Sequence, residues 1–127
     1  MGTGYHTEKV TDKPFYCFKL DPDTYEIEKF TINEYWVYTN IFTKHKTYSF
    51  DAPPHITKYD KHYSIRDNKF NRFVSGKVFT FNGDIESAID IIHLDMVLKY
   101  DKALIEVQKC ETMLDKFMEA NKNEIHN

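Results

Sequence analysis

The chain has little glycine, proline or cysteine and no long apolar run. Its 127 residues include four glycines, four prolines and two cysteines. No apolar run approaches the roughly 20 residues that a membrane-spanning helix needs, so we expect no contact with a membrane. Cys17 and Cys110 match no metal-binding or redox spacing, and the N-terminus has no apolar signal region. These absences favour the reducing environment of the cytoplasm.

Sequence motifs for chemistry are also missing. No serine lies in a glycine-rich nucleophile elbow or beside a motif-bearing histidine. The histidines lack the close spacing of zinc ligands, and the glycines form no phosphate-binding loop. We therefore expect no enzyme, no catalytic residue, no metal and no cofactor.

Aromatic residues are abundant, at 16% of the chain, and the first half is rich in them. The length suits one domain, residues 1–127, with a loose N-terminal arm (1–13), a β-rich part (14–83), a helical part (84–120) and a polar tail (121–127). Asp21 to Thr24 reads as a hairpin turn. Asp67 is expected to cap a short helix, 68–75, that Gly76 ends. The expected strands are 15–20, 25–32, 35–40, 46–50, 56–65 and 77–81.

The helical part contains neither glycine nor proline over its 37 residues. One straight helix of this length would extend about 55 Å, whereas a folded unit of roughly 80 residues measures about 25 to 30 Å. The helix, capped by Asn82 or Asp84, therefore either bends near Asp95 or Asp101 into a hairpin or packs against another copy of the chain. The predicted class is α+β, with an N-terminal antiparallel sheet and a short helix, then a long C-terminal helix or helical hairpin. Apolar residues spaced by seven define the expected interface of a homo-oligomer: Ile89, Met96, Tyr100, Ala103, Val107 and Leu114.

Positive charge is concentrated in the middle of a chain whose net charge is −3. Between Lys44 and Lys77, eight Lys/Arg face three Asp, a balance of +5, and aromatic residues lie among them. Cations bind phosphate and rings stack on bases, so this mixture suits a nucleotide site. A solvated basic face over an aromatic core is the competing interpretation. The candidate ligand residues, which a neighbouring protomer would complete, are Tyr63, Arg66, Lys69, Arg72, Phe79, Phe81 and Asn82.

The layout resembles the phage-encoded Thoeris anti-defence family of cyclic-ADP-ribose sponges. The likeness rests on the hairpin from Phe15 to Ile32 around Asp-Pro-Asp-Thr, the turn-and-helix Ser64-Ile65-Arg66-Asp67 to Phe73, and Lys77-Val78-Phe79-Thr80-Phe81-Asn82 leading into C-terminal helices. It implies a non-catalytic protein in the cytoplasm of an infected bacterium. Such a protein binds a cyclic nucleotide signal intact, in pockets between protomers that the helices assemble.

A second hypothesis is a phage inhibitor or adaptor that binds a partner protein through an acidic helical surface. From Asp84 to Asn127 there are ten Asp/Glu and five Lys, a balance of −5, which suits a basic partner. Binding of long nucleic acids is disfavoured by the overall negative charge.

Overall fold

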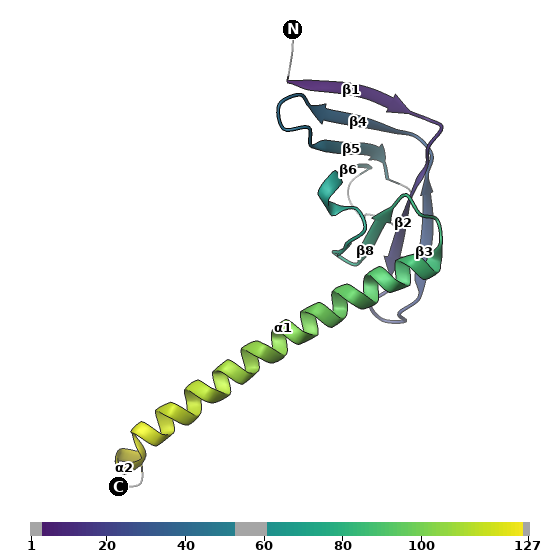
Figure 1. Ribbon diagram of the computed structural model, residues 1–127. Helices are drawn as coiled ribbons and strands as arrows, with labels where there is room; N and C mark the ends of the chain where they lie inside the picture. Colours follow the sequence, from purple (N-terminus) through teal and green to yellow (C-terminus); the bar gives the residue numbers. More distant parts are fainter. Residues whose placement is uncertain (1–3, 53–60, 126–127) are drawn as a thin grey trace. The chain divides into compact units, whose positions relative to one another are not determined.

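The computed structural model describes residues 4–52 and 61–125 (Figure 1). Two antiparallel four-stranded sheets precede a long C-terminal helix, so the protein has the α+β fold that the sequence predicts. Backbone contacts divide the chain into two compact units, residues 1–92 and 93–127. The expectation of one folding domain stays a prediction.

Both sheets belong to the first unit, and all their strand pairs are antiparallel. The first sheet has the order β1-β4-β5-β6 and comprises β1 Tyr5–Val10, β4 Tyr35–Asn40, β5 Lys46–Asp51 and β6 His62–Arg66. The second has the order β3-β2-β8-β7 and comprises β2 Phe15–Leu20, β3 Ile27–Ile32, β7 Phe73–Val74 and β8 Lys77–Thr80. The edge strands β6 and β7 are the ones that matter for the candidate site.

Alternation along β2 and β8 divides the buried side chains between two clusters. Phe15 and Cys17 of β2 and Phe79 of β8 pack with buried residues of the first sheet, including Phe50. The neighbouring residues Phe18 and Val78 point the other way and pack against Ala88 and Ile92, at the start of the C-terminal helix. Within the first unit, the second sheet is therefore covered on both faces.

The turn that joins β2 to β3 forms as predicted. The Asp21 carboxylate accepts hydrogen bonds from the backbone N–H groups of Asp23 and Thr24, at 2.8 and 3.1 Å. These two bonds stabilise the charged form and lower the pKa of Asp21. Strands 15–20 and 35–40 have their predicted bounds, and three others differ by one or two residues at an end. The expected strand 56–65 is seen as β6 from His62, and its first part lies outside the described residues.

The expectation of a loose arm over residues 1–13 is wrong for residues 5–10. These form β1, which pairs with β4 in a register from Tyr5–Asn40 to Val10–Tyr35. All but the last side chain of β1 are exposed, so this edge strand needs no apolar alternation. A polar sequence of this kind gives no periodic signal, and pairing with β4 alone makes it a strand.

The expected helix 68–75 is also wrong. Only Asp67–Lys69 is helical, as one 3₁₀ turn labelled η1, and Phe73–Val74 forms β7 instead. The Asp67 carboxylate does not cap this turn. It accepts a hydrogen bond from the backbone N–H of Lys46 at 3.1 Å and lies 3.8 Å from Nδ1 of His45. A contact distant in sequence therefore replaces the local cap that the pattern indicated.

The C-terminal helix α1 runs without interruption over Ile85–Ala120, so the helical-hairpin alternative is not adopted. The Asp84 carboxylate accepts the N–H of Glu86 at 3.2 Å, which makes Asp84 the cap. Asn82 supports the cap, because its side-chain oxygen accepts the N–H of Asp84 at 2.9 Å. In the expected polar tail, α2 adds a short helical turn over Lys122–Ile125.

Burial of Cys17 leads to a chemical prediction. Its side chain is 0% exposed, and desolvation raises the pKa of the thiol to about 12 despite nearby Lys77 and Lys19. At pH 8 the thiol is therefore protonated, and the reactive thiolate is scarce. In a Cys110→Ser variant, which lacks the exposed thiol, we expect Ellman's reagent to leave the native protein unlabelled and to label it fully in concentrated guanidinium chloride. Rapid labelling of the native protein would contradict this burial.

Candidate ligand-binding site

A cavity of about 290 Å³ lies where the edges of the two sheets approach each other. Its wall is built from β6 on one side, from η1 and the turn after it, and from β7 and β8 on the other side. The volume lies just below the range of roughly 300 to 1,000 Å³ typical of small-molecule sites. The cavity lies wholly within the first unit.

Two aromatic rings form part of the cavity wall. Tyr63 of β6 stacks on Phe79 of β8, with ring centroids 5.5 Å apart and planes inclined by 29°. Phe79 is 4% exposed and belongs to the core, whereas Tyr63 is half-buried. Burial, and then the proximity of Cys17, raises the pKa of Tyr63, so its hydroxyl stays neutral at physiological pH. The exposed part of the Tyr63 ring therefore offers an apolar surface beside a hydroxyl that can donate a hydrogen bond.

Four cationic side chains surround this wall, and no carboxylate does among the described lining residues. They are Arg66, Lys69, Arg72 and Lys77. Lys77 is half-buried, and its ammonium group donates to the backbone carbonyl of Ser75 at 3.3 Å. In the part of the chain that the structure describes, Arg66 and Lys69 form no ion pair and no side-chain hydrogen bond, so both can bind an anion.

The local backbone explains how these cations converge. Val74 pairs with Lys77, so Ser75 and Gly76 are the central residues of a two-residue hairpin turn. Their φ angles are 52° and 77°, the positive values that a type I′ turn requires. This tight turn keeps Lys77 beside β7, and the N–H of Asn71 donates to the Phe79 carbonyl at 2.8 Å, which ties the loop carrying Arg72 to β8.

The structure brings together five of the seven residues that the sequence suggested. All five line the cavity described above, and they come from a single chain: Tyr63, Arg66, Lys69, Arg72 and Phe79. Sequence reasoning did not select Lys77, although it ends the basic segment in which the other cations were found. The two-residue turn between β7 and β8 places Lys77 at the cavity. Because the sequence pattern favours a helix over residues 68–75, it does not predict this turn.

The other two suggested residues lie elsewhere. Phe81 stacks on Phe70, with centroids 5.1 Å apart, and the ammonium group of Lys13 lies 5.1 Å from its ring centroid. The Asn82 amide donates to the Ser87 hydroxyl at 3.0 Å, and its oxygen supports the helix cap described above. Asn82 therefore supports the start of α1, Phe81 packs against Phe70 and Phe15, and neither lines the cavity.

The six residues suggested for an oligomer interface all lie on α1 and are exposed. Ile89 belongs to the first unit, and the other five belong to the second. Their role as an interface is not decided by exposure and stays a prediction.

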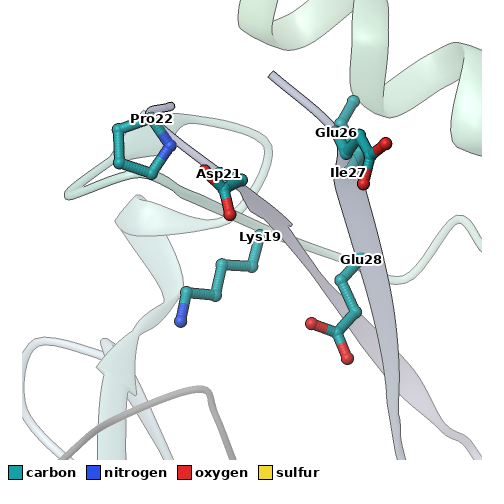
Figure 2. Close-up of a pocket in the computed structure, with 6 residues that line it drawn as sticks. All are labelled: Lys19, Asp21, Pro22, Glu26, Ile27 and Glu28. Carbon is teal, nitrogen blue, oxygen red and sulfur yellow. The ribbon is translucent and has the colours of Figure 1, made fainter. Parts of the chain in front are cut away.

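A second hollow, of about 390 Å³, lies at the β2–β3 turn (Figure 2). Asp21, Glu26 and Glu28 line it together with the single cation Lys19. The Asp21 carboxylate is already engaged by the turn, and the lining is predominantly acidic. This hollow therefore does not suit the phosphate-bearing ligand that the basic segment suggests.

Neither a membrane span nor a metal centre is found in the described residues. None of the described helices is long and apolar enough to span a membrane. Within residues 4–52 and 61–125, no three His, Cys, Asp or Glu side chains are grouped so as to hold a metal ion.

Comparisons of the chain with protein-family models, with curated proteins and with solved structures found no match. Function is therefore inferred from the cavity itself.

Proposed function

We propose that the protein is a phage sponge that binds a cyclic nucleotide-type immune signal, such as a cyclic ADP-ribose isomer, and sequesters it unchanged. The observation that carries the proposal is the lining of the cavity between the sheet edges. Four cations and no described carboxylate surround a stacked pair of aromatic rings. Phosphates pair with Arg and Lys, and a base stacks on an aromatic ring, so one nucleotide ligand uses both features.

The described lining supports binding without catalysis. It contains two serines, Ser64 and Ser75, but no His, Asp, Glu or Cys that could activate them or transfer protons. Tyr63 has a raised pKa and is a poor base at neutral pH. What the cavity offers is positive charge and stacking surface, and these retain an anion without changing its bonds.

The volume of the cavity also bears on the ligand. At about 290 Å³ it suits one nucleotide-sized group better than a whole cyclic dinucleotide-like molecule. The remaining part of a larger ligand then extends towards solvent, where a second copy of the chain can cover it. The proposal therefore includes a homo-oligomer.

The decisive experiment is capture and release. The purified protein is mixed with a panel of cyclic nucleotides and cyclic-ADP-ribose isomers, freed of unbound ligand, heat-denatured, and the supernatant is analysed by mass spectrometry. We expect one panel member to be released intact at a fixed molar ratio to protein. Release of an altered molecule would show an enzyme. Retention of none would overturn the proposal and favour the inhibitor that acts through an acidic helical surface.

A further inference from the structure

The second unit exposes large apolar side chains around much of the circumference of α1. Within residues 93–118 twelve large apolar side chains are at least 40% exposed: Leu94, Met96, Val97, Leu98, Tyr100, Leu104, Ile105, Val107, Met113, Leu114, Phe117 and Met118. Monomeric soluble proteins rarely expose a contiguous apolar area of more than a few hundred Å². In this unit the described structure contains only α1 and the short α2, so these side chains have no partner within the unit.

Five of these side chains lie on one face of α1, here called the seam, whose spacing identifies the kind of partner: Met96, Tyr100, Val107, Leu114 and Phe117. From His93 to Phe117 the positions 93, 96, 100, 103, 107, 110, 114 and 117 alternate in steps of three and four residues. All but His93 are apolar, and His93 lies at the end of the series. Steps of three and four average 3.5 residues, the repeat that keeps one face of a helix against another helix in a coiled coil. The partner is therefore a helix with the same repeat.

We propose that this partner is α1 of a second copy, packed antiparallel with Tyr100 of each helix opposite Cys110 of the other. In this register Ala103 lies opposite Val107, so a small side chain meets a larger one in both central layers. Met96 then lies opposite Leu114. Facing large and small residues fill the space between two helices at the density of a protein interior.

A parallel, in-register pair fits the same residues less well. In a parallel pair each seam residue faces the same residue of the other helix. Tyr100 then faces Tyr100, which overfills the space between the helices, and Ala103 faces Ala103, which leaves a gap. Glu106 also comes close to Glu111 of the partner helix in such a pair. In the antiparallel pair the two Glu106 side chains approach each other. Lys109 of the same helix lies 3.6 Å from Glu106 in either orientation, so charge does not distinguish the two pairs. The packing of large against small side chains favours the antiparallel pair.

The pairing extends the proposed function without depending on the cavity. It concerns residues 93–117 of the second unit, whereas the ligand residues belong to the first. Loss of ligand capture and loss of self-association are therefore separate results, and each can be measured in a variant that retains the other property.

The first test measures molar mass by light scattering during gel filtration. The wild-type chain of 15.2 kDa is expected to elute with at least twice that mass. Val107→Glu places a charge in the seam and is expected to give the monomer. Gln108→Glu adds the same charge one residue away, outside the seam, and is the matched control. A monomeric wild type, or equal behaviour of the two variants, would overturn the proposal.

The second test determines orientation by cross-linking. Under mild oxidation Tyr100→Cys is expected to give a covalent dimer on a non-reducing gel, because the introduced thiol faces Cys110 of the partner. Within one helix these two positions are about 15 Å apart, too far for a disulfide. Lys102→Cys, which points away from the seam, and the wild type are expected to stay uncross-linked. Efficient cross-linking of the wild type through Cys110 would show a parallel pair and overturn the antiparallel one.

Discussion

Reversing two charges in the cavity, Arg66→Glu with Lys69→Glu, is expected to weaken retention of the captured nucleotide by more than about 100-fold. Each charge-assisted hydrogen bond contributes about 1.5 to 3 kcal/mol, and every 1.4 kcal/mol changes affinity about tenfold. The two introduced carboxylates also repel phosphate. Titration calorimetry with the panel member that the wild type releases, or with cyclic ADP-ribose as the first probe, measures the loss directly.

The control for this variant must carry the same change in net charge. Lys44→Glu with Lys102→Glu reverses two exposed cations that do not line the cavity. We expect its affinity to stay within about threefold of the wild type, and we expect both double variants to keep the wild-type melting temperature. Equal loss of binding in the two would mean that overall charge attracts the ligand, and the assignment of the cavity would then be wrong.

Truncating Phe15 to alanine is expected to destabilise the first unit far more than any change at its surface. The ring is 0% exposed and contacts six aromatic neighbours at centroid distances between 4.8 and 6.3 Å, namely Tyr35, Tyr48, Phe50, Phe70, Phe79 and Phe81. Removing a buried Phe side chain costs about 3 to 5 kcal/mol. Whole domains are stable by only about 5 to 15 kcal/mol, so much of the stability is lost.

Calorimetry or circular dichroism can measure this effect. For a unit of about 60 to 100 residues, each 1 kcal/mol lowers the melting temperature by about 4 to 8 °C, so Phe15→Ala should lower it by at least about 12 °C. Phe42→Ala removes the same ring from a loop where it is 82% exposed, and it should shift stability by no more than about 0.5 kcal/mol. A small effect of Phe15→Ala would mean that the two sheets do not share the described core.

Predictions from local sequence were reliable where local chemistry decides the structure. Asp21 closes its turn through hydrogen bonds to residues two and three positions ahead, so the pattern predicts the β2–β3 hairpin directly. The start of α1 at Asp84 follows the same rule, and the absence of glycine and proline lets the helix continue to Ala120. These elements depend on contacts within a few residues.

The same reasoning failed where a distant partner competes with a local one. Asp67 is an ordinary helix cap by sequence, yet its carboxylate binds the backbone of Lys46, 21 residues earlier. β1 has no apolar alternation and is a strand because β4 provides hydrogen-bond partners. Asn82 and Phe81 looked like ligand residues because they follow an aromatic strand, but Asn82 bonds to the start of α1 and Phe81 stacks on Phe70.

Sequence alone determined the α+β class, the long helix, the basic aromatic segment and five of the residues that line the cavity, because composition and short-range spacing carry that information. Tertiary structure decided which of those residues meet. Arg66 lies on β6, the edge strand of one sheet, and Lys77 lies on the β7–β8 hairpin at the edge of the other. Both charges line one cavity only because these two edges approach each other. Pairing between strands far apart in the chain depends on the free energy of the whole core, which no local pattern encodes.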